Sequence, residues 1–416
     1  MFEQLFKQPC ALLRHRNAPL AAERASFLAK RAKDGAAPST LLKLARELFV
    51  IVQELEMELA NNNKITSSAI EVAAERWAQQ QKHRNRAQSE RWSQILFRQT
   101  ATAWLLFLGR LTIPEPEPKP FSSLVEHFTD NLQNERGLSP VTVANYQWHI
   151  ERFLTWFSTQ QQIFLEVSVA DTDSFLAHQG RHWRRVSIAT SAKALRAFFR
   201  YAEAQQWCRS GIAAAIESPR LFRDETLPAG PAWDDLQQLI PPYDTEQPHN
   251  IRDRAILLLF AVYGLRSGEV AKLQLEDINW ALEQVTITRT KHRCSQIYPL
   301  THEVGNAIVR YLLEVRPNCS RRELFLTFKA PFRPLSAGGL YHVTRSRFDR
   351  LGIQTPHRGP HALRHACACH LLAEGFSLEA IGDHLGHQNL SSTRHYAKVD
   401  LTGLREVARF DLGGLL

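Results

Sequence analysis

The sequence predicts a mainly α-helical chain with one small antiparallel β-sheet in its last third. Apolar side chains recur at i, i+3, i+4 and i+7 in segments of residues 1–216, which is the spacing of amphipathic helices. Residues 284–289 alternate as a strand, and 296–300 can pair with them. The 416 residues, 44% of them hydrophobic and 22% charged, suffice for two or three domains with buried cores, so global disorder is excluded.

The composition also limits the partners and the compartment. Lysine and arginine total 51 against 42 aspartate and glutamate, and the net charge of +9 favours a polyanionic partner such as nucleic acid, although charge alone is a weak argument about function. No apolar run is long enough to span a bilayer, and the N-terminus lacks the apolar segment of a secretory signal. Six scattered cysteines fit reduced thiols in a cytoplasm better than a disulfide framework.

Proline-rich segments divide the chain into three regions. The alternating prolines of 114–120 predict a semi-rigid linker after a first region, 1–113. A second break near 218–231 separates a middle region, 121–218, from a last region, 230–416.

The first region is predicted to be helical throughout, with helices over 41–52, 66–81 and 89–108. Nothing in it suggests chemistry. An additional DNA-contacting module, an oligomerisation element and a structural cap all fit this pattern, and the residues do not choose among them.

The middle region is also predicted to be helical, and its helix over 187–204 is informative. The apolar face of this helix carries Leu195, Phe198, Phe199 and Ala202. Basic residues on the opposite face, or just before the helix, are Lys193, Arg196, Arg200, Arg181, Arg184 and Arg185. Such a helix fits a duplex groove, where basic side chains displace counterions, but the solvated outer face of an ordinary amphipathic helix gives the same pattern.

The last region is predicted to combine helices with the short sheet. Its first helix, 251–262, is apolar and ends at a glycine-containing turn. Further helices are predicted near 302–315, 336–350, 361–374, 377–385 and 391–397.

His361, Arg364 and His365 lie on one side of a predicted helix because they are spaced three and four residues apart. A guanidinium matches the oxygens of a phosphate, and a histidine can donate a hydrogen bond or move a proton near neutral pH, so this cluster suits an anion. The i, i+4 histidine pair also has the spacing of a zinc-binding helix. A metal is the weaker hypothesis, because the glutamate of the His-Glu-x-x-His pattern is absent and the arginine would repel a cation.

Two further residues stand out, one on each side of that helix in sequence. Arg266 follows the apolar helix, and the carboxylate of Glu269 three residues later can orient its guanidinium. Tyr396 comes shortly after Ser391 and Ser392, which can cap a short helix. Taken alone, the first fits an exposed arginine at a helix boundary and the second a packing tyrosine.

Their order and spacing change that interpretation. Arg266, a lysine at 291, His361-x-x-Arg364, Gly386-His387 and a tyrosine nine residues after His387 resemble the tyrosine recombinase (phage integrase-like) family. The segment 290–300 ends in the Pro-Leu pair of the lysine-bearing turn of that family, although His292 and Cys294 replace the family's usual glycines and second lysine. Arg289 and Arg293 are therefore lesser candidates for the role of the lysine.

The resemblance implies that 230–416 is a mixed α/β catalytic domain with a C-terminal tail and that 121–218 is a helical core-binding domain that contacts DNA. The region 1–113 exceeds this two-domain plan. The tail residues 404–416 pack either within their own chain or onto a neighbouring protomer, and the sequence does not decide between these.

The family's reaction is DNA strand exchange through a 3′-phosphotyrosine, which needs neither metal, ATP nor another cofactor. The residues that the resemblance makes catalytic are Arg266, Lys291, His361, Arg364, His387 and Tyr396, with Glu269 in support. Tyr396 is the implied nucleophile, His361 its general base and Lys291 the acid that protonates the leaving 5′-oxygen. The two arginines would clamp the phosphate oxygens, with His387 as a further hydrogen-bond donor.

The implied function is that of a site-specific recombinase or integrase of a mobile element. Its expected partners are double-stranded DNA and further copies of the chain, four on paired sites, with sister recombinases or DNA-bending proteins as additional partners in the cytoplasmic nucleoid. The alternatives are a chromosome-dimer resolvase, an enzyme that only nicks and reseals, a catalytically silent DNA-binding regulator, and a metal-dependent nuclease.

Overall fold

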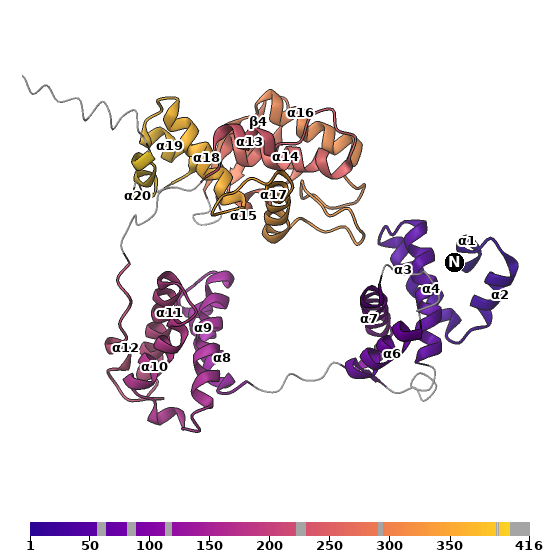
Figure 1. Cartoon of the computed structure of the whole chain (residues 1–416), viewed down its shortest axis with the longest axis horizontal. Helices are drawn as coiled ribbons and strands as arrows, with labels where there is room; N and C mark the ends of the chain where they lie inside the picture. The colour runs from indigo at the N-terminus through magenta and orange to yellow at the C-terminus, as the bar shows by residue number, and fades with distance from the viewer. Residues whose placement is uncertain are drawn as a thin grey trace, which may run out of the picture. The chain divides into compact units, whose positions relative to one another are not determined.

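The structure is a computed structural model that describes residues 1–55, 64–80, 89–112, 119–221, 230–289, 294–387, 389 and 391–399. It confirms the predicted fold class. Helices dominate the chain (Figure 1), and the largest described sheet has three strands, paired antiparallel. The chain divides into two compact units, one made of 114–225 and the other of 1–113 with 226–416. Within 1–113 and 226–416 the apolar side chains form separate cores. Each part is therefore described by itself.

The described residues of the first region form six helices and a pair of very short strands. The helices are α1 (Phe2–Leu5), α2 (Pro9–Asn17), α3 (Ala21–Lys33), α4 (Pro38–Glu54), α6 (Ser67–Gln80) and α7 (Glu90–Phe107). The strands β1 (Ile65–Thr66) and β2 (Leu111–Thr112) pair in parallel, so the prediction of a region helical throughout was wrong at this point. The pair is too short for an alternating pattern to reveal it. The core is dense, and Leu48, Ile51, Phe97 and Trp104 are fully buried in it.

The middle region is a helical bundle. Its helices are α8 (Ser122–Asp130), the π-helical turn η2 (Asn131–Glu135), α9 (Pro140–Ser158), the 3₁₀ turn η3 (Phe164–Glu166), α10 (Val169–Gly180), α11 (Arg185–Ala204) and α12 (Ile212–Ala215). The hydroxyl of Ser139 caps α9 by accepting a hydrogen bond of 3.3 Å from the backbone nitrogen of Thr142. Helix α11 packs on α9 through the predicted apolar face, because Leu195, Phe198 and Phe199 are fully buried.

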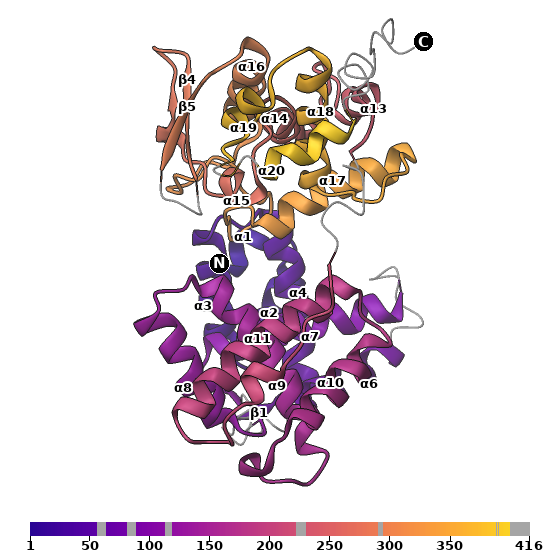
Figure 2. The ribbon, with the colours of Figure 1, turned by 90° about the vertical axis from the view of Figure 1, so that its left-hand side faces the viewer.

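The last region is mixed α/β. Its elements are α13 (Trp233–Leu239), α14 (Pro248–Tyr263), α15 (Ser267–Val270), the 3₁₀ turn η4 (Leu275–Asp277), β3 (Ile278–Asn279), β4 (Gln284–Thr288), β5 (Ser295–Pro299), α16 (His302–Arg310), the π-helical turn η5 (Tyr311–Val315), α17 (Ala337–Leu351), α18 (Pro360–Ala373), α19 (Leu378–Leu385), α20 (Ser391–Arg394) and the 3₁₀ turn η6 (His395–Val399). Strand β4 lies between β3 and β5, with Val285 opposite Tyr298. In Figure 2 the β4–β5 hairpin stands at the edge of this helical region.

Helix α14 organises the core of the last region. It packs against α16 and α18, and its residues from Ala255 to Ala261 are almost completely buried. It ends at Gly264, whose φ of +56° is left-handed, and a Cβ there would collide with Leu385. The chain can therefore turn sharply after α14, close to Leu385 of α19. This turn leaves Arg266 at the edge of the core, where its side chain is partly exposed.

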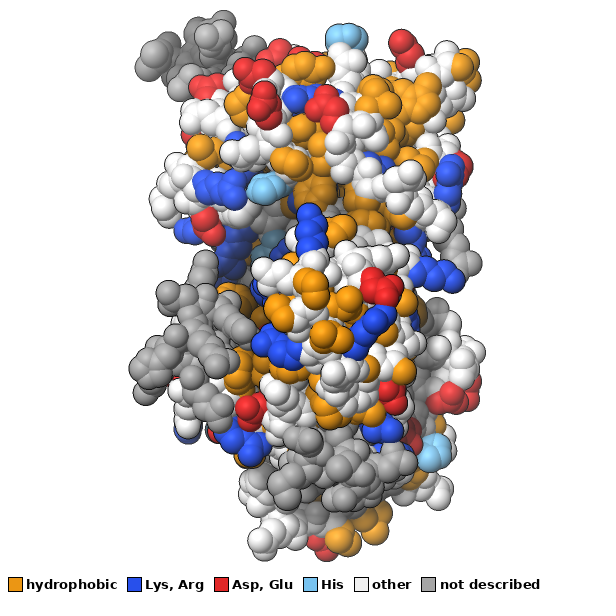
Figure 3. Space-filling model, turned by 90° about the vertical axis from the view of Figure 1, so that its right-hand side faces the viewer, with side chains coloured by type: hydrophobic (Ala, Val, Ile, Leu, Met, Phe, Trp, Pro, Cys, Tyr) orange, Lys and Arg blue, Asp and Glu red, His pale blue; other side chains and the backbone are white. Residues whose placement is uncertain are grey.

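The surface carries charges of both signs. On the face shown in Figure 3, basic and acidic side chains are interspersed with apolar ones. In the described part of the chain, none of the helices has the length and apolar character needed to cross a membrane.

Candidate active site

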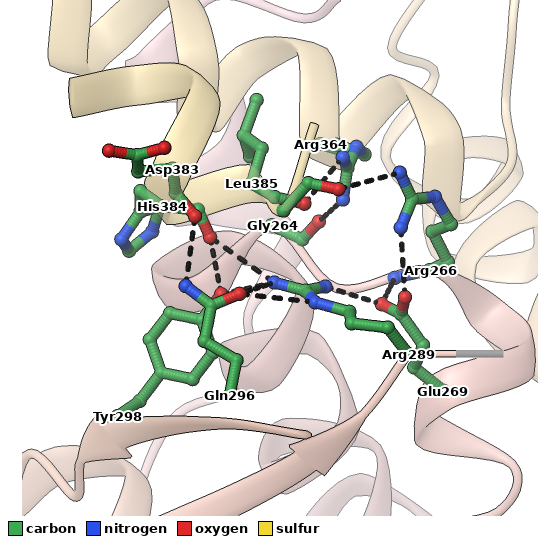
Figure 4. A network of polar contacts seen from close by, with 11 residues as sticks. Gly264, Arg266, Glu269, Arg289, Gln296, Tyr298, Arg364, Asp383, His384 and Leu385 are labelled. Carbon is green, nitrogen blue, oxygen red and sulfur yellow. Dashed lines mark hydrogen bonds and ion pairs between the residues drawn. The ribbon is translucent and has the colours of Figure 1, made fainter. Parts of the chain in front are cut away.

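Arg266 and Glu269 form the first part of the site, at the start of α15. The Arg266 backbone nitrogen donates to Glu269 Oε2 at 2.8 Å, and Arg266 Nη1 donates to Glu269 Oε1 at 2.9 Å. Arg266 Nη2 reaches the Gly386 carbonyl at 3.4 Å (Figure 4). The predicted orientation of Arg266 by Glu269 is confirmed. Because the Arg266 side chain keeps 34% of its surface exposed while the Glu269 side chain has none, the arginine can still meet a ligand.

Arg289 is the residue that sequence reasoning undervalued. Its Nη1 donates to Glu269 Oε2 at 2.8 Å, and its Nη2 donates to Gln296 Oε1 at 2.7 Å and to the Tyr298 hydroxyl. Gln296 in turn donates to the Asp383 carbonyl at 2.8 Å. With a guanidinium held from several sides, Arg289 does not fit the role of a mobile proton donor, which the sequence left open for it. It joins the β4–β5 hairpin to Glu269 and α19 (Figure 4).

A sequence signal for this role did exist. Val285, Ile287 and Arg289 are spaced two residues apart, so they share one face of β4 and its extension. All three are buried, with exposed fractions of 0%, 1% and 4%. An arginine on the inward face of a strand needs a carboxylate, and Glu269 supplies it.

Arg364 lies beneath the surface of the site and is only 2% exposed. The sequence places Arg364 on one side of a helix with His361 and His365. In the structure α18 turns the Arg364 side chain inward, while His361 keeps more of its surface exposed. Its Nη1 donates to the Gly264 carbonyl at 2.6 Å and its Nη2 to the Leu385 carbonyl at 2.8 Å. These carbonyls lie at the C-terminal ends of α14 and α19, where a cation is favourable. Burial, followed by the charge of Arg266, lowers the pKa of Arg364 to about 10.

His387 follows the last turn of α19 and is held by Thr393. Its Nδ1 lies 2.9 Å from Thr393 Oγ1, so Nε2 is the nitrogen left to meet a ligand. A Cβ on Gly382 would lie 2.9 Å from the same Thr393 oxygen, which leaves this position no room for a side chain. Burial and then the charges of Arg364 and Arg266 lower the pKa of His387 to about 4.

Tyr396 lies on η6 and is 2% exposed, in a small core with Ala368, Ile381 and Leu385. Its ring centroid lies 5.5 Å from that of His365, which in turn lies 4.3 Å from that of His361. The fold thus brings the predicted nucleophile to the histidines of α18. Burial raises the pKa of Tyr396 to about 12, although Arg364 acts in the opposite direction.

A pocket of about 590 Å³ opens beside these residues, and Arg266, Arg289, His387, Asn389 and Ser392 are among those that line it. Three arginines, at 266, 289 and 364, outnumber the two carboxylates of this part of the structure, which are Glu269 and the lining residue Asp383. The pocket is therefore electropositive and suits an anion such as a phosphate.

Some residues and hypotheses from the sequence are not part of the site as the structure describes it. Lys291 and its alternative Arg293 lie outside the described residues, as does the tail 404–416. The metal hypothesis needed several donors together, and within the described ranges no three histidine, cysteine or acidic side chains come close enough to hold an ion. The nearby thiol of Cys367 lies 3.7 Å from the Val262 carbonyl.

The basic residues of the middle region do not all point to solvent. Those that are exposed are Arg181, Arg184, Arg185, Lys193 and Arg200. Arg196 instead donates from Nη2 to the Ile216 carbonyl and to Ser218 Oγ, both at 2.9 Å, so it holds the chain after α12. These contacts give Arg196 a structural role, and its contact with DNA stays a prediction.

Comparisons with known proteins identify the class to which this fold belongs. The family description "Phage integrase family" matches residues 232–402, and "Phage integrase, N-terminal SAM-like domain" matches 125–206. A protein of Sinorhizobium fredii (strain NBRC 101917 / NGR234) named for an integrase/recombinase role, y4rA, is 35% identical over 295 residues, which cover 70% of this chain and 71% of that protein. Tyrosine recombinase XerD of Lacticaseibacillus casei is 28% identical over 66% of this chain and 92% of its own.

Solved structures share the fold. The XerH site-specific recombinase, bound to its palindromic difH substrate, aligns with a TM-score of 0.56 at 17% identity, over 83% of this chain and 96% of its own. A lambda integrase dimer bound to a core site aligns with a TM-score of 0.51 at 16% identity, over 66% of this chain and 94% of its own. The chain belongs to the tyrosine recombinase (phage integrase) family.

Proposed function

We propose that this chain is a site-specific DNA recombinase that cuts and rejoins double-stranded DNA through a covalent link between Tyr396 and a 3′-phosphate. The observation that carries the proposal is the electropositive pocket of Arg266 and His387, with Arg364 beneath it and Tyr396 on the adjoining helix. The names of the relatives and the DNA-bound structures support double-stranded DNA as the substrate.

The arginines would lower the barrier by neutralising charge. A phosphodiester repels a nucleophile, and the repulsion is relieved when its non-bridging oxygens meet fixed cations. Arg266 and Arg364 carry two positive charges on one side of the site, and Glu269 is already paired with Arg289 as well as with Arg266. The site would therefore keep an excess of positive charge that attracts a bound phosphate, and His387 Nε2 would be a further hydrogen-bond donor.

In the proposed cleavage step the Tyr396 oxygen attacks phosphorus, and the bond from phosphorus to the 5′-oxygen breaks. Tyrosine is protonated at neutral pH, and the rise of the Tyr396 pKa to about 12 makes its proton harder to remove, so the proton must be accepted during the attack. His361 would accept it. Burial and the charges of Arg364, His357 and Arg266 lower the pKa of His361, which keeps its imidazole neutral and able to take up a proton. Lys291 would give a proton to the departing 5′-oxygen.

The second step reverses the first. A 5′-hydroxyl from a partner duplex attacks the phosphotyrosine, which restores a phosphodiester and frees Tyr396. Because the phosphotyrosine keeps the energy of the broken bond, neither ATP nor a metal is needed. Exchange between two duplexes requires paired active sites, so we propose that four copies assemble on two DNA sites in the nucleoid.

We further propose that the chain serves a mobile element, as an integrase. The support is the similarity to y4rA and the presence of the region 1–113, which precedes both family matches. The similarity to XerD supports the second candidate, a chromosome-dimer resolvase. The two candidates are separated by measuring recombination on two substrates. An integrase should recombine a circular element that carries its own ends, and a resolvase should recombine a chromosomal dimer site.

The proposal is tested by covalent trapping on fragmented DNA of the host. Protein and DNA are mixed and denatured in detergent, and the DNA that stays attached to protein is sequenced, with and without EDTA. We expect linked ends at recurrent sites in both arms, and none with Tyr396→Phe. Linkage that EDTA abolishes would favour a metal-dependent nuclease, and binding without linkage in every arm would favour a silent regulator.

A further inference from the structure

The first region holds a pocket that the proposed function does not use. It has a volume of about 470 Å³ and lies among α1, α2 and α4. Lys7, Arg14 and Arg46 line it, and all three are exposed. Phe6 and Phe49 provide apolar wall, and none of the described residues that line the pocket is acidic. The pocket is therefore cationic at its opening and aromatic inside.

His15 lines this pocket but is only 1% exposed. Its ring stacks on Phe6 with 4.1 Å between centroids and lies 5.0 Å from Phe49. Its Nδ1 is buried and has no hydrogen-bond partner in the described part of the chain. Since a buried polar atom without a partner costs free energy, its occurrence beside a pocket points to a group that is not part of the chain.

Arg24 adds a buried positive charge behind His15 and is 0% exposed. Its Nη2 donates to the His15 carbonyl at 2.7 Å and the Ala18 carbonyl at 3.1 Å, and its Nε to the Pro19 carbonyl at 3.1 Å. Its Nη1 has no partner among the described residues. Carbonyl oxygens satisfy the hydrogen bonds of a guanidinium but not its charge. Among the described residues Arg24 forms no ion pair, and the favourable charge of Glu23 is outweighed by burial, which lowers the pKa of Arg24 to about 10.

The pKa of His15 is also affected by the positive charges around the pocket. Burial is the main cause of its fall to about 4, and the charges of Arg24, Arg14 and Arg46 lower it further. His15 is thus neutral near pH 7, and the positive potential at the pocket comes from the surrounding arginines and Lys7.

We propose that this pocket binds a phosphate group, presented by a nucleotide or by the backbone of a DNA duplex. Lys7, Arg14 and Arg46 would donate to its oxygens, and the added negative charge would offset that of Arg24. The aromatic wall and the volume leave room for atoms attached to the phosphate. The inference does not depend on the chemistry of Tyr396.

The test is isothermal titration calorimetry of the full chain with three probes: inorganic phosphate, deoxyadenosine monophosphate and a short DNA duplex of unrelated sequence. Arg46→Glu is compared with Lys33→Glu, which makes the same charge change at an exposed lysine of the same region that does not line the pocket. Other phosphate-binding surfaces, including the pocket at Arg266, are intact in both variants. The difference between the two therefore isolates the pocket around His15.

We expect Lys33→Glu to bind like the wild type and Arg46→Glu to lose about tenfold in affinity, the size of one charge-assisted contact. A loss confined to the small probes identifies a free nucleotide as the source of the phosphate, and a loss with the duplex identifies DNA. Equal affinities of the two variants for all three probes would overturn the proposal. Arg14→Glu repeats the comparison should thermal unfolding show that Arg46→Glu is misfolded.

Discussion

The carboxylate of Glu269 and the guanidinium of Arg289 form a buried ion pair, with 2.8 Å between Oε2 and Nη1 and exposed fractions of 0% and 4% for the two side chains. The other oxygen of Glu269 holds Arg266. Glu269 thus fixes the exposed arginine of the site to a buried one that reaches the β4–β5 hairpin and α19. The position of Arg266 therefore depends on this buried ion pair as well as on its own contact with Glu269.

Removing Arg289 should destabilise the last region strongly. Arg289→Met leaves a buried carboxylate with one partner fewer, and breaking a buried pair from one side costs about 3–5 kcal/mol. Arg322→Met is the matched control, because Arg322 pairs with Glu276 on the surface, where 61% and 53% of the two side chains are exposed. That change should cost little stability, because an exposed ion pair is screened by water. Urea unfolding of the full chain measures both, and equal costs would contradict the role given to Arg289.

Gly386 should tolerate no side chain. Its φ is +64°, and a Cβ would lie 2.5 Å from Arg289 Nε. Gly352 has a φ of +65° with nothing within 4 Å of a Cβ, so Gly352→Ala measures the backbone strain alone, about 1–2 kcal/mol. Gly386→Ala should cost more and should also slow DNA cleavage, because Arg289 and Arg266 would be displaced. Similar melting temperatures for the two variants would show that the close approach is unimportant.

Acid should weaken the fold through His365. Burial and then the charges of His361 and His395 lower its pKa from 6.5 to about 4. As the pH falls from 6.5 towards 4, the unfolded chain takes up a proton that the folded chain does not, so the free energy of unfolding falls. Above pH 6.5 the His365 side chain is neutral in both states, so the free energy of unfolding no longer changes with its protonation. In this pH window His365→Gln should make the free energy of unfolding less dependent on pH, by a slope that corresponds to up to about one bound proton.

The matched control for that measurement is His302→Gln, at an exposed position on α16. We expect it to keep the slope of the wild type in urea unfolding between pH 4 and 7. A His365→Gln variant that loses stability with acid as steeply as the wild type would contradict the prediction.

Basic side chains of α11 should separate into two kinds. Lys193→Ala and Arg200→Ala remove exposed cations, so each should weaken DNA binding and reduce the salt dependence of log K by about one unit. Arg196→Ala should instead lower the melting temperature, because it removes the contacts to Ile216 and Ser218. Filter binding at several salt concentrations, with thermal unfolding alongside, tests both. A melting temperature unchanged in Arg196→Ala would restore it to the DNA-facing set.

The sequence predicted most of the long elements because their patterns are local. The apolar face of α11 and the hairpin of β4 and β5 follow from residue spacing alone, and Glu269 could be paired with Arg266 because one helical turn separates them. What escaped prediction depends on contacts across long stretches of chain. Arg289 meets His384 and Arg364 meets Gly264 only once α14, α18 and α19 have packed. The parallel pair β1–β2 likewise joins residues 65 and 111.

The central claim is that Tyr396 becomes covalently attached to DNA, and peptide mapping tests it most directly. Trapped complexes are digested with nuclease and protease, and mass spectrometry locates the residue that carries the nucleotide. We predict a nucleotide on Tyr396, at a 3′-phosphate, and no adduct in Tyr396→Phe, which should still bind DNA. A nucleotide on another residue, or an adduct that persists in Tyr396→Phe, would contradict the account.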